Sequence, residues 1–218
     1  MAKEVMVADE GDENEDTVLD PSGMNPFEDK KILVRRNDIF LYKSIDDDLA
    51  REFADQLEAM YLNLLQICIS TGLGNPRINL HLCSAGGGLE AGFAIIESMK
   101  DIQTGLKPFN IPMAVDTYIE GNADSCASLI ACCGSRRYIS KYAGSVIHGL
   151  SGGAEGKNRD IQTIAQNIMD MERVYKSIYL SHSKLTEEEL DAMLKEERRY
   201  TPDFLLEKGL VDEITSSY

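Results

Sequence analysis

Residues 78–103 read INLHLCSAGGGLEAGFAIIESMKDIQ, and this stretch decides the fold that we predict for the chain. Its first seven residues, INLHLCS, are typical of a short buried strand. The glycine-rich AGGG that follows predicts a tight turn, and the residues after the turn predict a helix. A strand, a turn and a helix in direct succession form a repeating unit of layered α/β domains.

The alternation of strands and helices continues on both sides of this stretch. Residues 30–46 are strand-like, and residues 46–70 place apolar side chains at helical spacing after a run of aspartates. Thr186 and Glu189 predict a capping box at the start of a later helix. The other predicted elements are a strand at 112–121, an apolar helix at 125–134, two short strands within 136–153, a long helix at 159–184, and a short helix, a glycine stop and a closing strand within 201–214.

Length and charge limit the classes of protein that the chain can represent. Its 218 residues fit one large domain, or one domain with an appendage. Residues 1–26 are acidic and poor in apolar side chains, so we expect a mobile tail followed by a single domain at 27–218. The net charge of −15 argues against nucleic acid or an anionic membrane as the main partner. No stretch is apolar enough to span a bilayer, and the N-terminus lacks the apolar core of a secretory signal.

The five cysteines lie in apolar surroundings and are predicted to be small buried hydrophobic residues. Their odd number favours a reducing, cytoplasmic compartment over a disulfide framework. Cys132 and Cys133 are adjacent, and neighbouring side chains of a helix or strand point apart. We therefore expect no metal site there, and no cofactor elsewhere.

The glycines of the decisive stretch allow three interpretations. Gly86, Gly88 and Gly92, with Asp116 on a later strand, resemble a dinucleotide-binding fingerprint. That match is imperfect, because Gly92 stands one residue late and Asp116 is inside its strand. The second interpretation is an oxyanion site, since backbone N–H groups at such a turn can point at a developing negative charge. The third is a tight turn without a further role.

Ser125 in EGNADSCASLI follows a turn and opens the apolar helix. A serine in this position is usually an N-cap, but its hydroxyl can also stay accessible as a nucleophile. A nucleophile needs a base, and the chain has three histidines. His81 lies within a strand and is predicted to pack in the core, and His182 follows a long helix as a solvated end residue. His148 ends a strand before a glycine-rich stretch, where functional side chains tend to be displayed.

Asp124 stands directly before Ser125 and has two possible roles. Its carboxylate could shift the pKa of the base or repel acidic substrates. Alternatively, it could favour the positive end of the helix that follows, and this second interpretation is the one we favour from the sequence.

Four ordered segments together resemble the proteolytic subunit of the Clp protease (ClpP) of the ClpP/crotonase superfamily. LCSAGGGLEAGFAIIESM resembles the Ser-Pro-Gly-Gly segment of that family, with Ala85 in place of proline. GNADSCASL is similar to the Gly-x-Ala-x-Ser segment, SVIHGLSGGAEGKNRDI to the histidine segment, and YTPDFLLEKGLVDEI to the closing helix and strand. The resemblance covers most of the chain and implies an α/β fold of repeated ββα units with a protruding handle helix.

The resemblance also implies a function. Ser125 would be the nucleophile and His148 the base of a serine endopeptidase acting on unfolded proteins or peptides. The backbone N–H groups of Gly86 or Gly87 and of Cys126 would form the oxyanion hole. The handle, at about residues 154–182, would interlock subunits. In the family, rings of seven stack around a chamber, and a separate AAA+ unfoldase that hydrolyses ATP feeds in polypeptide substrates.

The third catalytic residue is where the sequence departs from the family. An ungapped count from KGLVD puts Met193 at the position of the family's aspartate. Head-maturation proteases of tailed phages, which resemble ClpP, place their acid slightly later, where this chain has Lys195 beside Glu196. We therefore predict Glu196 as the third member. The alternative is that Glu196 and Glu197 are solvated charges at the end of a helix.

Three other functions stay open from the sequence. Met193 is compatible with a catalytically weak or inactive ClpP-like subunit that serves assembly. A crotonase-type acyl-CoA enzyme would share the fold and the oxyanion hole without needing a serine–histidine pair. A phage capsid-maturation peptidase would be encoded beside capsid genes.

Overall fold

The computed structural model describes residues 32–72, 74, 76–150 and 157–216. The chain divides into two units, Met1–Lys30 and Lys31–Tyr218. The tail predicted at residues 1–26 lies outside the described residues, as do residues 154–156 of the predicted handle region. The fold described below is that of the second unit.

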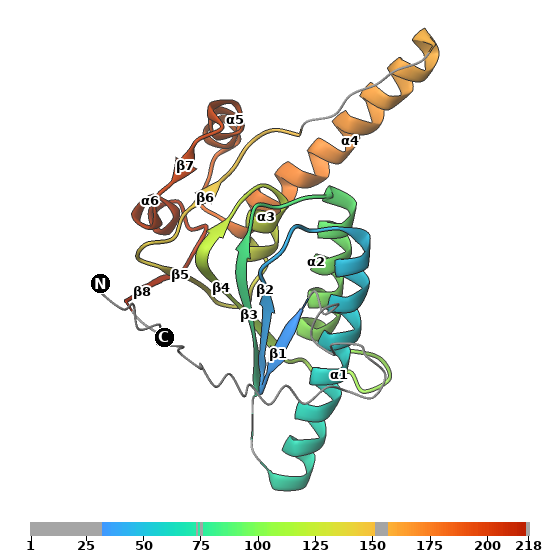
Figure 1. Cartoon of the computed structure of the whole chain (residues 1–218), viewed down its shortest axis with the longest axis vertical. Coiled ribbons are helices and arrows are strands. Elements are labelled where there is room, and N and C mark those ends of the chain that lie inside the picture. The colour runs from blue at the N-terminus through green and yellow to red at the C-terminus, as the bar shows by residue number, and fades with distance from the viewer. Residues whose placement is uncertain (1–31, 73, 75, 151–156, 217–218) are drawn as a thin grey trace, which may run out of the picture. The chain divides into compact units, whose positions relative to one another are not determined.

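A six-stranded sheet in the order β1-β2-β3-β4-β5-β8 is the centre of the unit (Figure 1). Every neighbouring pair is parallel except β1–β2, which is antiparallel. Parallel neighbours need crossover connections, and helices of the chain supply them. The strands are β1 (Leu33–Arg35), β2 (Asp38–Leu41), β3 (Arg77–Ser84), β4 (Ala114–Ala123), β5 (Arg137–Ser140) and β8 (Glu213–Thr215), and a separate pair joins β6 (Ser145–Val146) to β7 (Arg199–Tyr200). The mixed α/β architecture that we predicted is confirmed.

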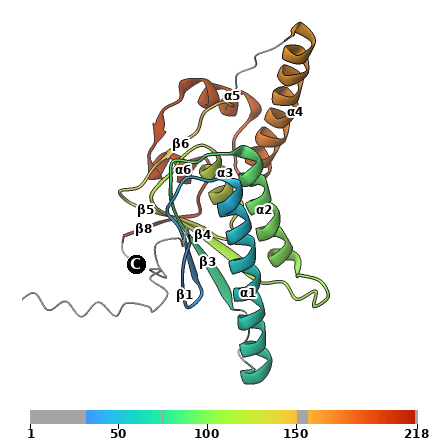
Figure 2. The ribbon, with the colours of Figure 1, turned by 45° about the vertical axis from the view of Figure 1, so that its right-hand side comes forward.

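In the part of the chain that the structure describes, six helices accompany the sheet, and α1 and α2 lie side by side along it in both views (Figures 1 and 2). Helix α3 sits close to the end of β4, whereas the long α4 runs away from the sheet. The helices are α1 (Asp47–Thr71), α2 (Leu89–Thr104), α3 (Cys126–Cys132), α4 (Asn158–His182), α5 (Glu187–Glu196) and α6 (Pro202–Glu207).

Local sequence signals explain where several helices begin. Asp46 caps α1, since its side chain accepts a hydrogen bond from the N–H of Leu49 at 2.7 Å. The predicted capping box of α5 is confirmed, with both reciprocal bonds between Thr186 and Glu189 present. Thr201 caps α6, which has proline in its first turn.

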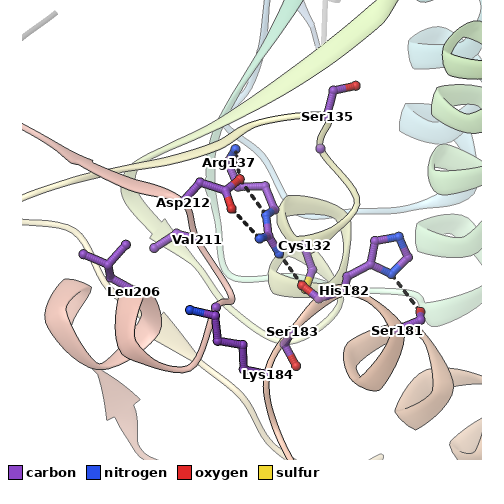
Figure 3. A pocket seen from close by; sticks show the side chains of 12 residues that line it. Cys132, Ser135, Arg137, Ser181, His182, Ser183, Lys184, Leu206, Val211 and Asp212 are labelled. Carbon is purple, nitrogen blue, oxygen red and sulfur yellow. Dashed lines mark hydrogen bonds and ion pairs between the residues drawn. The ribbon is translucent and has the colours of Figure 1, made fainter.

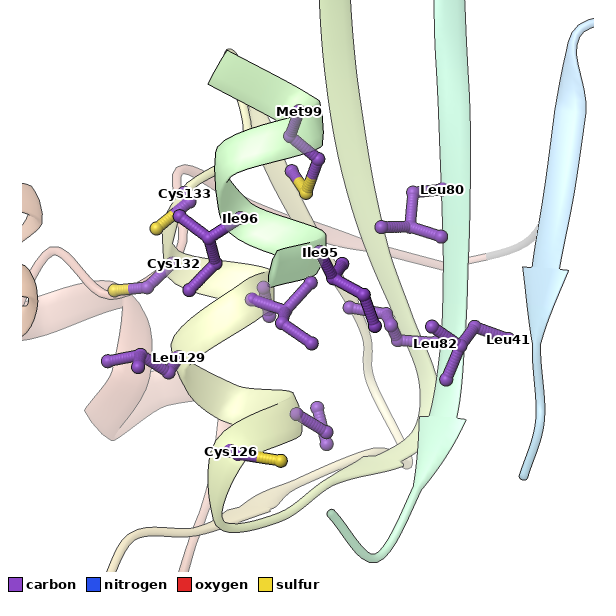
Figure 4. Packing of buried hydrophobic residues seen from close by; sticks show 14 of the residues in the cluster. Leu41, Leu80, Leu82, Ile95, Ile96, Met99, Cys126, Leu129, Cys132 and Cys133 are labelled. Atoms are coloured by element: carbon purple, nitrogen blue, oxygen red, sulfur yellow. The ribbon is translucent and has the colours of Figure 1, made fainter. Parts of the chain in front are cut away.

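The core packs β3 against α2 and α3 (Figure 4). Leu80 and Leu82 of β3 are fully buried, and so is Ile95 of α2. Burying each such side chain stabilises the folded state by roughly 1.5–3 kcal/mol relative to leaving it exposed to water. Helix α3 is buried along its whole length, so the residue at its N-terminus is held against a close-packed core.

Candidate active site

The turn between β3 and α2 packs directly against Ser125. Gly86 has φ +89°, a backbone conformation that residues with a side chain rarely adopt. A Cβ at Gly86 would lie 2.6 Å from the carbonyl oxygen of Asp124 and 2.7 Å from the Cβ of Ser125. The turn can therefore approach the serine this closely only because glycine has no side chain.

Ser125 occupies the N-cap position of α3, but its side chain makes no capping hydrogen bond. Its φ of 55° and ψ of −129° are unusual for a residue with a side chain. Such a backbone conformation costs on the order of 1–3 kcal/mol and is concentrated at functional sites. The interpretation of Ser125 as an ordinary capping serine is wrong, because the hydroxyl makes no bond to the start of the helix.

The glycine turn lies close to the start of α3, since a Cβ at Gly86 would lie 3.2 Å from the backbone nitrogen of Cys126. Burial raises the pKa of the Cys126 thiol to about 11, and hydrogen bonds from the backbone of Gly87 and of Cys126 itself act against this rise. The N–H of Gly86 instead donates to the hydroxyl of Ser84 at 3.1 Å. The oxyanion hole of Gly86 or Gly87 with Cys126 stays a prediction.

The segment that leads to His148 is held against Ser125. The N–H of Ser125 donates to the carbonyl oxygen of Val146 at 2.8 Å, and the N–H of Val146 donates to Oδ1 of Asp124 at the same distance. His148 follows Val146 by two residues. The favoured interpretation of Asp124, a charge that only stabilises a helix terminus, is incomplete because its carboxylate binds a second chain segment.

The His148 ring is half-buried, and its Nδ1 lies 2.7 Å from the carbonyl oxygen of Gly149. A carbonyl oxygen can only accept, so Nδ1 carries the hydrogen and Nε2 of the neutral ring has a free lone pair. The N–H of Gly149 donates to the carbonyl oxygen of Leu194 at 2.9 Å, which anchors this peptide to α5. The ring is thus held as the tautomer that a general base requires.

Glu196, the predicted third catalytic residue, and the nearby carboxylate of Asp191 both have other partners. Glu196 forms an ion pair with Arg198 at 2.9 Å, and Asp191 forms one with Lys176 at 2.6 Å. Met193 is buried in the core. Among the residues that the structure describes, no hydrogen bond or ion pair joins Glu196 to His148. Glu196 as the third member stays a prediction.

Hydroxyl groups connect the serine and histidine segments through α4. The Ser128 hydroxyl donates to the carbonyl oxygen of Ser125 at 2.6 Å and also contacts the hydroxyl of Tyr179. Tyr179 lies 3.3 Å from the hydroxyl of Tyr175, which donates to the carbonyl oxygen of His148 at 3.2 Å. Both tyrosines are buried, and burial raises the pKa of Tyr175 to about 12. This chain of hydroxyls was not predicted, since nothing in the sequence distinguishes these tyrosines from other core residues.

The other sequence candidates have structural roles. His81 is buried, as predicted, with its ring stacked between Phe40 and Tyr118, and desolvation lowers its pKa. His182 ends α4 and is half-buried, not solvated as we expected. The dinucleotide interpretation is wrong, because the carboxylate of Asp116 is buried and binds the guanidinium of Arg77.

The cysteine prediction is partly confirmed. Cys126, Cys132 and Cys133 are buried, whereas Cys68 and Cys83 are half-buried, and all five are free thiols. Burial raises the pKa of Cys132 and of Cys133 to about 12, so their thiolate forms are scarce near neutral pH. Within the described ranges, no group of three or more histidine, cysteine or acidic side chains could hold a metal ion.

A separate pocket of about 480 Å³ lies between β5, the end of α4 and the start of β8 (Figure 3). Arg137 dominates it, with its guanidinium bound to Asp212 at 2.6 and 3.0 Å and to the carbonyl oxygen of His182. Ser125 and His148 do not line this pocket. Arg137 and Asp212 already bind one another, and Arg137 also joins β5 to the end of α4 through the carbonyl oxygen of His182.

Comparison with known protein families agrees with this geometry. The sequence model of a family described as Clp protease matches residues 22–218, which is most of the chain. The chain belongs to the Clp protease family. Membership supports a ClpP-like serine peptidase with the corresponding α/β fold, as the resemblance implied. In the part of the chain that the structure describes, no helix has both the length and the apolar character needed to cross a membrane.

Proposed function

We propose that the chain is a serine endopeptidase with Ser125 as nucleophile and His148 as general base. The conformation of Ser125 is the observation that carries the proposal. Its hydroxyl makes no capping bond, its φ is positive, and a glycine turn packs against its Cβ. A structural serine would need none of these three features.

In the proposed reaction, Nε2 of His148 takes the proton of the Ser125 hydroxyl as the oxygen attacks the peptide carbonyl. The backbone N–H groups of Cys126 and of Gly87 or Gly86 bind the oxyanion that forms. His148 then gives the proton to the departing amine. Water attacks the remaining acyl group as His148 takes its proton, and His148 returns the proton to the Ser125 oxygen when the acid product leaves.

Two groups are proposed for the acceptor of the Nδ1 hydrogen of His148. The carbonyl oxygen of Gly149 has this role in the structure, at 2.7 Å. Glu196 would have to leave Arg198 to replace it. A neutral carbonyl fixes the tautomer but stabilises the imidazolium less than a carboxylate does, so a slower enzyme is expected with Gly149 alone.

A fluorophosphonate probe tests the proposed nucleophile directly. We expect the native protein to react once per chain, on Ser125, because only an activated serine attacks such a phosphorus centre. Mass spectrometry of the digested adduct locates the label, and heat-denatured protein is the control.

Absence of label would favour the second candidate, an inactive assembly subunit, which the burial of Met193 and the Glu196–Arg198 pair support. It would also reopen the crotonase-type alternative, whereas capsid genes beside the coding sequence would indicate a phage maturation peptidase.

Self-association into rings, proposed as stacked heptamers, accompanies this function. Ile161, Met169 and Val174 expose apolar side chains along α4, the helix that the family resemblance assigns to the handle. Light scattering after size exclusion should give a mass many times the 24.2 kDa of one chain, and a monomeric mass would contradict the proposal.

We propose a separate AAA+ unfoldase as the partner that delivers protein substrates. The free cysteines fit the proposed cytoplasmic location.

A further inference from the structure

We propose that Asp124 is a positioning residue that holds the His148 segment in register with Ser125. This inference rests on the proposed serine peptidase function and names a residue that acts through two others. Asp124 does not touch the substrate in this proposal. Its carboxylate fixes the backbone from which the base extends.

Asp124 binds three parts of the site at once. Its backbone N–H donates to the carbonyl oxygen of Ser84 at 2.9 Å, where β3 enters the glycine turn. Its Oδ1 accepts from the N–H of Val146 at 2.8 Å, and its Oδ2 accepts from the side-chain amide of Asn122 at 2.7 Å. Asp124 is therefore hydrogen-bonded to the start of the glycine turn, to the end of β4 and to β6.

Strand β6 depends on such ties for its position. It has two residues and pairs with β7, outside the six-stranded sheet. Gly144 contacts the end of β4 through bonds of 3.2 and 3.3 Å, and Ser145 donates its hydroxyl to the carbonyl oxygen of Ala123. These contacts hold the start of the segment. Val146, the residue of β6 that is nearer to His148, is held through its carbonyl oxygen by the N–H of Ser125 and through its N–H by the carboxylate of Asp124.

The bond from Asp124 to Val146 is charge-assisted, because a carboxylate accepts it. Bonds of this kind are roughly twice as strong as those between neutral groups. Without the carboxylate, the N–H of Val146 loses its hydrogen-bond acceptor. Strand β6 can then move away from the turn at Asp124 and Ser125, called the serine turn below. A displacement of about 1 Å in a catalytic group can lower the rate on the order of 100-fold. Substrate binding does not involve this bond, so KM should stay nearly constant.

The test compares Asp124→Ala with Asp124→Asn and Asp212→Ala. The asparagine side chain would keep an acceptor for Val146, and the amide of Asn122 can turn to accept from the new NH₂ group. Asp212 is a matched control, because it also accepts a backbone N–H, that of Arg137 at 2.9 Å, but lies in the separate pocket. Steady-state hydrolysis of a fluorogenic peptide gives kcat and KM. Hydrogen exchange of peptides that contain Val146 reports the backbone independently of activity.

We expect Asp124→Ala to lower kcat about 30- to 100-fold, with KM within about twofold and faster exchange at Val146. Asp124→Asn should recover kcat to within about fivefold of the native protein, and Asp212→Ala should leave exchange at Val146 unchanged. Equal kcat in the alanine variant and the native protein would overturn the inference while the proposed function stands. An equal loss of kcat in both Asp124 variants and in Asp212→Ala would also overturn it, as a general effect of stability.

The proposed function can fail separately. If the native protein and Ser125→Ala have the same background rate, the peptidase proposal is wrong, and exchange at Val146 then decides the role of Asp124. Faster exchange in Asp124→Ala alone would support its role in holding β6, and unchanged exchange would overturn it.

Discussion

Replacing His148 by alanine is expected to lower kcat for peptide hydrolysis by a factor on the order of 10⁴–10⁶, with little change in KM. The serine hydroxyl is a weak nucleophile until a base removes its proton, and loss of the base in a serine protease costs about as much as loss of the serine. Because the ring does not take part in substrate binding, the loss should appear in kcat. Steady-state hydrolysis of a fluorogenic peptide measures both constants, and fluorophosphonate labelling of Ser125 should fall in parallel.

His182→Ala is the matched control for this prediction. His182 is also half-buried, and its Nδ1 also lies 2.8 Å from a backbone carbonyl, that of Ile178, but it belongs to the separate pocket. Its removal should leave kcat within about threefold of the native value, as expected for a residue outside the chemistry. If His148→Ala retained native activity, the assignment of the base would be wrong. A comparable loss in His182→Ala would indicate a shared effect on folding.

Glu196→Gln, in the same assay, separates the two proposed acceptors of the Nδ1 hydrogen. The glutamine keeps the size of the side chain and removes its charge. If Glu196 orients His148 during turnover, kcat should fall on the order of 10³–10⁴, as it does when a triad acid is replaced. If the carbonyl oxygen of Gly149 has that role, as its 2.7 Å contact indicates, kcat should change by less than about threefold.

The elements of the fold could be predicted from the sequence because their signals are local. The capping box of Thr186 and Glu189 and the strand–turn–helix at residues 78–103 each depend on neighbours within a few positions. The glycine turn and the position of Ser125 at the start of a helix could also be predicted from the sequence. The contact between them could not, because Gly86 meets Ser125 only after β3 and β4 pair.

The supporting contacts of the site could not be predicted from the sequence either, because they join residues that are far apart along the chain. Asp124 reaches Val146 across 22 positions, and Ser128 reaches Tyr179 across 51. In the sequence, Asp124 before a helix is equally typical of a charge at a helix N-terminus. Only the placement of β6 beside the serine turn shows that its carboxylate has a specific backbone partner. The choice between Glu196 and Gly149 also depends on tertiary placement, since Arg198 competes for the carboxylate.

Replacing Gly86 by alanine is expected to lower kcat at least about 100-fold and also to destabilise the fold. The new Cβ would lie 2.6 Å from the carbonyl oxygen of Asp124 and 2.7 Å from the Cβ of Ser125, closer than van der Waals contact permits. The turn cannot easily retreat, because the carbonyl oxygen of Gly86 accepts from the N–H of Ile45 at 2.9 Å and from the hydroxyl of Ser44 at 3.1 Å. The serine turn must move instead, which separates Ser125 from the oxyanion donors.

Gly88→Ala, two residues along the same turn, is the control that separates the geometry of the site from the loss of any glycine. Gly88 has φ −62°, and an added Cβ would meet its nearest neighbours at 3.7 and 3.8 Å, which is ordinary contact. This variant should keep kcat within a few-fold and unfold near the native temperature. For Gly86→Ala, the left-handed backbone alone should lower the free energy of unfolding by about 1–3 kcal/mol, visible in a thermal melt. Native kcat in Gly86→Ala would mean that the turn can move away from Ser125 without affecting the reaction, and the oxyanion hole would then have to be formed by other groups.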